Sequence, residues 1–329
     1  MRQGRAGVRR TLVSLVPIGV LVLCLGSIPL PLYVEEPGPA RDVVPRIDID
    51  GTATYQPNGR LYFTTVSFFE PTVYGMLMGW LDPVERVMPQ EAIIPEGVSE
   101  QEYERINVSL MDQSQIAAVS ASLRGLTEYP AEHGPGVIVY GTVPDSPAAG
   151  RLFAGDLVTE IDGETVDGIG EFSKAVREAG TGHELALRVR PLEGGVTQTV
   201  RVRPAPFRGR PAVGVYLVPN FPFQVRFEAG DVGGPSAGLM WGLGVTDMLT
   251  PGDLAGGRSI AGTGTIGVKG EIGPIGGVAL KVAAAEEAGA EAFLLPTENL
   301  AEARTAGSDI RLVPVTTLDQ AIDFLEEEA

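Results

Sequence analysis

The chain has 329 residues, more than a single hydrophobic core usually holds, so we expect at least two folded units. Hydrophobic residues make up 44% of the chain and charged residues 20%, which excludes a chain that is disordered throughout. The net charge is −17, and residues 1–10 contribute four arginines and no acid, so the remaining chain carries −21. Nucleic acid is therefore excluded as an expected partner, because phosphate binding requires a basic surface.

Thiol and imidazole groups are scarce. The single cysteine, Cys24, cannot form an intrachain disulfide, and His133 and His183 are the only histidines. We therefore expect no metal site and no catalysis by histidine. Lysine is also rare, with three residues against 22 arginines, so a lysine within an apolar segment is a candidate functional residue.

The first predicted element is a membrane anchor. Residues 11–34 contain no charged side chain and follow a basic tail, residues 1–10. A helix of this length would measure about 36 Å, enough to cross a bilayer core, and the preceding arginines place the rest of the chain outside the cytoplasm. We therefore expect a single-pass protein of the cell membrane with an extracytoplasmic body. A cleaved signal peptide is the alternative, because prolines and a glycine interrupt the run.

Residues 35–130 predict a small strand-rich lead-in followed by a helix. Residues 60–69 are apolar and rich in β-branched and aromatic side chains, which predicts a strand. Residues 101–126 carry apolar side chains at helical spacing, and Ser99 with Glu102 matches a capping box. We expect this helix to bridge the lead-in and the rest of the chain.

Residues 131–205 change to short strands and turns, with one helix. We expect strands at 137–143, 152–161, 184–191 and 197–204, and a helix at 169–179. The turns Ser-Pro-Ala-Ala at 146–149, Ala-Gly-Asp-Leu-Val at 154–158 and Ile-Asp-Gly-Glu-Thr-Val at 161–166 resemble those of a protease-associated PDZ domain. The resemblance implies capture of an extended peptide as an added strand, with Gly134, Gly136 and Val137 as the expected peptide-binding residues. A structural β domain without a ligand is the alternative.

Two glycine-rich motifs in the last third fail the tests of their usual functions. Residues 234–238 read Gly-Pro-Ser-Ala-Gly and match a hydrolase nucleophile elbow, but no histidine follows Ser236 to complete a triad. Residues 262–267 match G-x-G-x-x-G, but strand and turn residues follow instead of a helix, which argues against a dinucleotide site. The chain lacks a G-x-x-x-x-G-K-[ST] motif, so we expect no ATP hydrolysis.

Lys281 is the remaining candidate base for Ser236. It lies in a predicted helix within residues 276–289 and is surrounded in sequence by apolar residues. Burial there disfavours the ammonium form and lowers the pKa of the lysine, and serine–lysine pairs are an established nucleophile–base arrangement. A lysine that extends its charged end to solvent is the alternative interpretation of the same spacing.

Residues 211–326 resemble the proteolytic domain of the Lon family of serine–lysine peptidases. The shared segments, in order, are Gly-Pro-Ser-Ala-Gly at 234–238, Ile-Ala-Gly-Thr-Gly at 260–264 and Gly-Glu-Ile-Gly-Pro-Ile-Gly-Gly at 270–277. The resemblance implies Ser236 as nucleophile, Lys281 as base and Thr263 as the side chain that orients the lysine. Backbone N–H groups of Ser236 and Ala237, at a predicted helix start, would bind the oxyanion. Many Lon proteases have Asp directly before the serine motif, where this chain has Gly233.

We therefore expect an α+β multidomain protein: a basic tail (1–10), a transmembrane helix (11–34), a lead-in with a bridging helix (35–130), a PDZ-like domain (131–205) and a Lon-type α/β proteolytic domain (206–329). This order resembles the membrane-anchored PDZ–Lon-like proteases, which lack an ATPase module. The resemblance implies an ATP-independent serine endopeptidase that uses no cofactor, cleaves unfolded or regulatory polypeptides and assembles as a homo-oligomer such as a hexamer. A non-catalytic scaffold and a self-processing protein are the alternatives.

Overall fold

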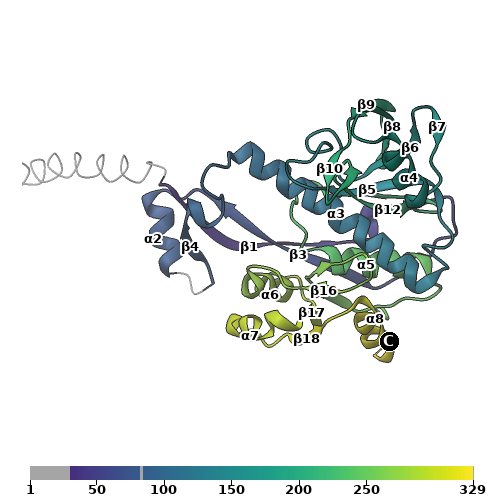
Figure 1. Ribbon diagram of the computed structural model, residues 1–329. Helices are drawn as coiled ribbons and strands as arrows, with labels where there is room; N and C mark the ends of the chain where they lie inside the picture. The colour runs from purple at the N-terminus through teal and green to yellow at the C-terminus, as the bar shows by residue number, and fades with distance from the viewer. Residues whose placement is uncertain (1–29, 82–83, 329) are drawn as a thin grey trace, which may run out of the picture.

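The computed structural model describes residues 30–81 and 84–328 (Figure 1). Most of the expected membrane anchor, residues 11–34, lies outside these described residues. Its last three residues, 32–34, are the beginning of strand β1 (Leu32–Asp42). Within the described ranges, none of the helices has both the length and the hydropathy that crossing a bilayer requires.

A six-stranded mixed sheet joins the two ends of the chain. Its strand order is β18-β17-β14-β3-β1-β4. The strand predicted at residues 60–69 is confirmed as β3 (Arg60–Phe69), which pairs antiparallel with β1 and parallel with β14 (Ser259–Gly262). The other members are β4 (Arg86–Pro89), β17 (Ala292–Pro296) and β18 (Arg311–Val315). The lead-in strands β1 and β3 therefore belong to the same sheet as the C-terminal strands.

Helices cover both faces of this mixed sheet. Side chains alternate between the faces along each strand, as the strand period of two requires. Leu61, Ile260 and Leu294 face α5 (Gly238–Leu249) and α8 (Leu318–Glu327), whereas Ala261 and Phe293 face α6 (Val278–Glu287) and the short α7 (Leu300–Ala303). Helices α5 and α6 thus lie on opposite faces of the sheet. Their N-terminal ends can meet only beyond the carboxyl ends of the parallel strands.

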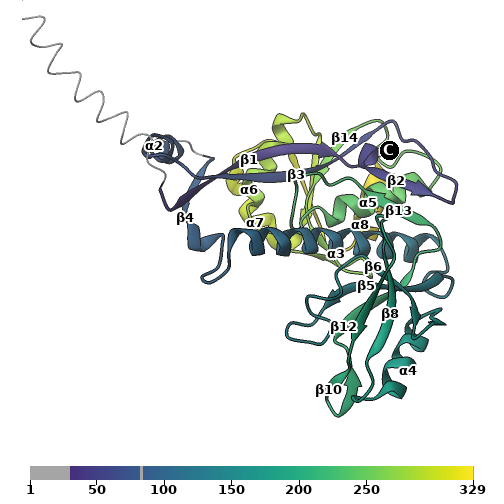
Figure 2. The ribbon, with the colours of Figure 1, turned by 90° about the horizontal axis from the view of Figure 1, so that it is seen from above.

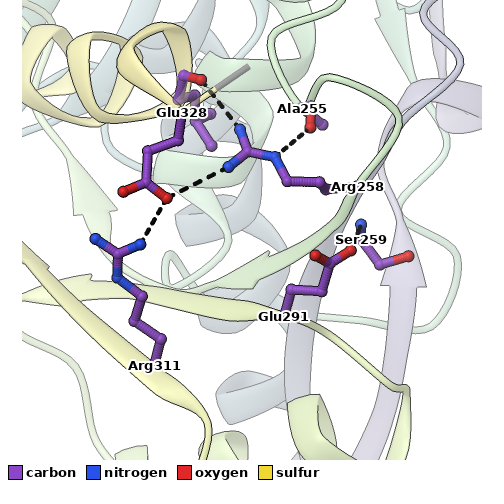
Figure 3. Close-up of polar contacts among 7 residues, drawn as sticks. Ala255, Arg258, Ser259, Glu291, Arg311 and Glu328 are labelled. Carbon is purple, nitrogen blue, oxygen red and sulfur yellow. Dashed lines mark hydrogen bonds and ion pairs between the residues drawn. The ribbon is translucent and has the colours of Figure 1, made fainter.

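Arg258 and Glu328 fix the C-terminal helix to the opposite end of β14 (Figure 3). The Glu328 carboxylate lies 2.5 Å from Nη1 of Arg311 and 3.7 Å from Nη1 of Arg258. Arg258 also donates from Nε to the Ala255 carbonyl at 2.7 Å and from Nη2 to the Leu325 carbonyl at 3.0 Å. The start of β14 is thus held in place, and its carboxyl end is left to the site described below.

The predicted bridging helix is confirmed as α3 (Glu100–Leu126), whose cap forms as expected: Ser99 Oγ accepts from the Glu102 N–H at 3.2 Å. Figures 1 and 2 show α3 lying between the mixed sheet and a second unit that contains β5 to β12. Residues 114–123, in its C-terminal half, are all buried, because α5 packs on one side and the second unit on another. Ser122 donates to the Gly242 carbonyl of α5 at 2.9 Å.

The second unit, residues 134–220, is a sheet of order β12-β5-β6-β8-β9 covered by one helix. Its members are β5 (Gly134–Thr142), β6 (Asp156–Ile161), β7 (Glu164–Thr165), α4 (Ile169–Ala179), β8 (Leu185–Pro191), β9 (Gln198–Val202) and β12 (Val215–Asn220). The helix predicted at 169–179 is confirmed as α4. Although β12 follows residue 205, it pairs with β5, so this sheet extends into the segment assigned from sequence to the proteolytic domain.

Several small elements complete the fold. Three strand pairs lie outside the main sheets: β2 (Ile47–Asp50) with β13 (Gln224–Phe227), β10 (Ala205–Phe207) with β11 (Arg210–Ala212), and β15 (Thr265–Ile266) with β16 (Ile272–Gly273). Helix α2 (Val73–Leu81) follows β3. Short 3₁₀ turns occur at Val44–Arg46, Gln90–Ala92, Thr297–Asn299 and Arg304–Ala306.

Candidate active site

Three polar side chains from different elements meet at the carboxyl end of β14. Ser236 precedes α5, Lys281 lies in the first turn of α6 and Thr263 directly follows β14. The Nζ atom of Lys281 donates to Ser236 Oγ at 2.6 Å and to Thr263 Oγ1 at 3.2 Å. The structure thus brings together the three side chains that the sequence motifs selected, at the strand ends where open parallel sheets commonly place ligands.

Burial changes the protonation of Lys281. The residue is 4% exposed, so its amine does not extend to solvent. Loss of hydration disfavours the ammonium form and lowers the pKa of Lys281 to about 8, while the carboxylate of Glu35 acts in the opposite direction. The neutral amine is therefore accessible near physiological pH and can accept a proton from Ser236.

Helix α3 and the end of β14 hold the loop that presents Ser236. Gly234 has a φ of 85°, a conformation that glycine adopts without strain, and its N–H donates to the Asn107 carbonyl at 2.8 Å. Ser114 Oγ donates to the carbonyl of the residue before Ser236 at 3.1 Å. On the other side, Thr263 Oγ1 donates to the Ser236 carbonyl at 3.0 Å. Because that hydroxyl proton is used, Thr263 can only accept from Lys281, which fixes the direction of the lysine.

The last glycine of the serine motif is required by packing. A Cβ atom at Gly238 would lie 2.6 Å from Ile266 Cγ2 and 2.7 Å from Ser114 Oγ. The first turn of α5 is therefore pressed between α3 and β15, and a side chain at this position would displace Ser236.

Two backbone donors beside Ser236 are not used by other groups. Among the hydrogen bonds between described residues, none has the N–H of Ser236 or of Ala237 as its donor. Both groups belong to the start of α5, where backbone N–H groups lack partners within the helix. They can therefore donate to a developing oxyanion, as the sequence predicts.

A cavity of about 350 Å³ opens beside Pro235. The β15–β16 hairpin and α3 form its walls, and Tyr140 of β5 reaches it from the second unit. Most of the large lining side chains are apolar: Leu110, Tyr140, Ile266 and Ile272. The space is sufficient for several atoms of a polypeptide side chain next to Pro235, the residue before Ser236.

Comparison with known families agrees with this geometry. Residues 225–325 match the family described as Lon protease (S16) C-terminal proteolytic domain, and residues 138–191 match the PDZ domain family. The chain contains a Lon-type proteolytic domain and a PDZ domain. The Lon-type match indicates a serine peptidase.

Individual relatives of the Lon-type domain are moderately similar. Lon protease 2 of Bacillus subtilis is 30% identical over 105 residues, covering 32% of this chain and 19% of that protein. Lon protease 1 of Thermus thermophilus is 37% identical over 94 residues, covering 29% of this chain and 11% of that protein. A solved structure of the PDZ domain of an SdrC-like protein from Listeria innocua is 30% identical, covers 25% of this chain and 92% of that one, and has a TM-score of 0.23. The chain spans less than a fifth of the length of these two Lon proteases.

The residues that the sequence predicts to bind a peptide lie at the start of β5. Gly134, Gly136 and Val137 lie in β5, which pairs with β12 on one side and β6 on the other. Val137 has a strand partner on both sides, whereas Gly134 and Gly136 precede the residues of β5 that pair with β6, so peptide binding by these three residues stays a prediction. The outer edge next to α4 belongs instead to β12, which the sequence assigned to the following domain.

Three residues near the site were not identified from the sequence. Asn107 and Ser114 of α3 position the serine loop from more than 100 residues away in the chain. Glu35 of β1 is buried, burial raises its pKa, and its Oε1 would lie 3.0 Å from a Cβ atom at Gly277, which precedes α6. No local pattern marks these residues, because their partners come from other elements.

Proposed function

We propose that this chain is a serine endopeptidase that works without ATP, with Ser236 as nucleophile and Lys281 as general base. The observation that carries the proposal is the 2.6 Å hydrogen bond from the buried Lys281 amine to Ser236 Oγ within a Lon-type proteolytic domain. A binding scaffold requires neither a buried lysine nor a serine held against it. A buried charge that lacks such a role is costly to keep.

The reaction begins when the neutral Lys281 amine accepts the proton of Ser236 Oγ and that oxygen attacks the carbonyl carbon of a peptide bond. The carbonyl oxygen becomes an oxyanion, to which the N–H groups of Ser236 and Ala237 donate. The C–N bond then breaks, Lys281 returns the proton to the leaving amine, and the acyl group remains as an ester on Ser236. Water next loses a proton to Lys281 and attacks the ester, and the lysine protonates the departing Ser236 oxygen.

Substrate selection would combine the cavity beside Pro235 with the PDZ domain. An extended segment can add along the open edge of β12, next to α4, through main-chain hydrogen bonds. Such pairing requires a chain without its own secondary structure, so unfolded or regulatory polypeptides are the proposed substrates. Tyr140 of the PDZ sheet lines the cavity next to the serine motif, which supports a connection between binding and cleavage. By analogy with Lon domains, the proposed working form is a homo-oligomer such as a hexamer.

The proposed location is the extracytoplasmic side of the cell membrane. The support is the uncharged run at residues 11–34 after four arginines. In this arrangement the serine–lysine pair would act without cytoplasmic nucleotide.

The test uses the full chain, purified in detergent without nucleotide, and a fluorescently labelled unfolded protein as substrate. The wild type and Lys269→Ala, which removes an exposed lysine, should release fluorescence at the same rate. Ser236→Ala and Lys281→Ala should each lower the rate at least about a thousandfold. Absence of hydrolysis by the wild type between about pH 6 and 10, together with absence of labelling by a serine-directed probe, would favour the scaffold. Cleavage of its own chain alone would indicate self-processing.

A further inference from the structure

Helix α2 presents its apolar side chains to solvent. Tyr74, Leu77, Met78 and Leu81 follow the spacing i, i+3, i+4, i+7 and are all exposed, Leu81 to 77%. Trp80, beside them, is 66% exposed. We call these five side chains the α2 face.

The opposite side of α2 is the packed side. A Cβ atom at Gly79 would lie 3.2 Å from Val87 Cγ2 and 3.4 Å from Val34 Cγ1, so this side of the helix rests on β4 and β1. Surface helices of globular proteins normally direct charged side chains outward. Residues 71–81 contain no charged residue, and Phe68 and Phe69 at the end of β3 are exposed next to them. An uncharged apolar surface of this kind normally has a partner.

The location of the α2 face indicates which partner covers it. The N–H of Leu30 donates to the Pro71 carbonyl at 3.2 Å, so the described chain begins beside the start of α2. In sequence, residues 11–29 before this point are uncharged and largely apolar. Figures 1 and 2 both show α2 at the end of β1 and β3 that lies farthest from the PDZ domain and from the C-terminus.

We propose that the α2 face lies in the interfacial region of a lipid bilayer, with the helix parallel to the membrane plane. Trp and Tyr favour the headgroup level, and Leu and Met at their side reach the acyl chains. The inference concerns membrane contact of the folded body and goes beyond the proposed protease activity and anchor. It leaves the PDZ domain, at the opposite end of the molecule, in water.

A second copy of the chain is the competing occupant, and the position of the α2 face argues against it. The face lies beside Leu30, directly after the uncharged, largely apolar residues 11–29 of the sequence. The absence of basic residues also defines the type of lipid contact. Binding should be insensitive to salt and should not require anionic lipid, because no charge pair is involved.

The experiment uses the two tryptophans of the chain. Trp80 is in the α2 face, whereas Trp241 is fully buried between Phe63 and Phe227. The full chain is reconstituted in phosphatidylcholine vesicles with or without brominated acyl chains, and the spectrum of Trp80→Phe is subtracted from that of the wild type. The Trp80 emission should shift to shorter wavelength, lose at least about half its intensity to brominated lipid and become inaccessible to acrylamide, at both about 0.05 M and 0.5 M salt.

Substitutions distinguish the outcomes. Leu81→Glu should restore acrylamide access to Trp80, whereas Val196→Glu, at an 86% exposed position of the PDZ domain, should leave the quenching unchanged. A Trp80 that acrylamide reaches in vesicles overturns the proposal. So does a Trp80 shielded from both quenchers, which would place a second copy on the face. The fluorescence requires no proteolysis, so a failure here is separate from a failure of the proposed protease function.

Discussion

Replacing Lys281 by Met should abolish proteolysis and at the same time stabilise the fold at neutral pH. Burial lowers the pKa of Lys281 from its ordinary 10.5 to about 8. Between these two values the unfolded state binds more protons than the folded state, so the stability of the wild type rises with pH there. Below about pH 8 the buried lysine lowers the free energy of unfolding by the full amount that corresponds to its pKa shift. Above about pH 10.5 this destabilisation is absent.

The size of the gain follows from the same values. The difference between the pKa of Lys281 in the unfolded and in the folded state corresponds to roughly 3 kcal/mol of unfolding free energy, at about 1.4 kcal/mol per tenfold change in proton affinity. Loss of the hydrogen bonds from Lys281 to Ser236 and Thr263 offsets about 0.5–1.5 kcal/mol each, since the pKa difference already contains what is specific to the ammonium form. We therefore expect a net gain of up to roughly 2 kcal/mol at pH 7, which raises Tm by up to about 8 °C.

Thermal unfolding at several pH values, followed by the fluorescence of Trp241 in the core of the mixed sheet, measures this gain. The increase in Tm of Lys281→Met should shrink as the pH approaches about 10.5. Lys269→Met, at an exposed lysine, is the matched control and should behave as wild type throughout. A lower Tm for Lys281→Met at pH 7, or a gain that does not change with pH, would refute the reasoning from burial.

Substitutions at three further positions test the surroundings of the pair. Glu35→Gln removes the charge that raises the pKa of Lys281, so the pH of half-maximal kcat/KM should move to a lower value in a pH–rate profile. Thr263→Val loses the hydrogen bonds to Lys281 and to the Ser236 carbonyl; kcat should fall about 10- to 100-fold, and Thr263→Ser should restore most of it. Gly238→Ala places a Cβ atom 2.6 Å from a neighbouring side chain and should cost about 1–3 kcal/mol in denaturant unfolding; unchanged stability would show that the turn is not tightly packed.

Elements defined by local signals were predictable from sequence. The capping box at Ser99 marks the start of α3, and the pattern at residues 169–179 gives α4 with the same bounds. The apolar, aromatic-rich residues 60–69 form β3. In each case the turn or cap chemistry and the apolar period lie within a short window of sequence.

Pairings between distant segments were not predictable. Residues 60–63 of β3 pair in parallel with residues 259–262 of β14, and no local feature of either strand specifies the other. The same holds for β12, whose sequence is adjacent to the proteolytic domain although its hydrogen bonds go to the PDZ sheet. Strand register of this kind is decided by burial in the whole fold.

The same distinction between local signals and long-range contacts holds for the residues of the candidate site. Ser236, Thr263 and Lys281 were found because glycine-rich segments of recognisable spacing surround them. Asn107 and Glu35 act on these residues from α3 and β1, which carry no such segment. Residues 114–123 of α3 are buried on all sides, so in that part of the helix no one-sided apolar stripe shows which residues face the site.

The central claim is that the buried Lys281 amine activates Ser236. The most direct test is the rate at which a fluorophosphonate labels the full chain, read by intact mass between about pH 6 and 10. We expect one label, on Ser236, at a rate that rises through about pH 8 and is lost in both Ser236→Ala and Lys281→Met. Labelling of Ser236 that is independent of pH and unchanged in Lys281→Met, or no labelling of the wild type at any pH, would contradict the account.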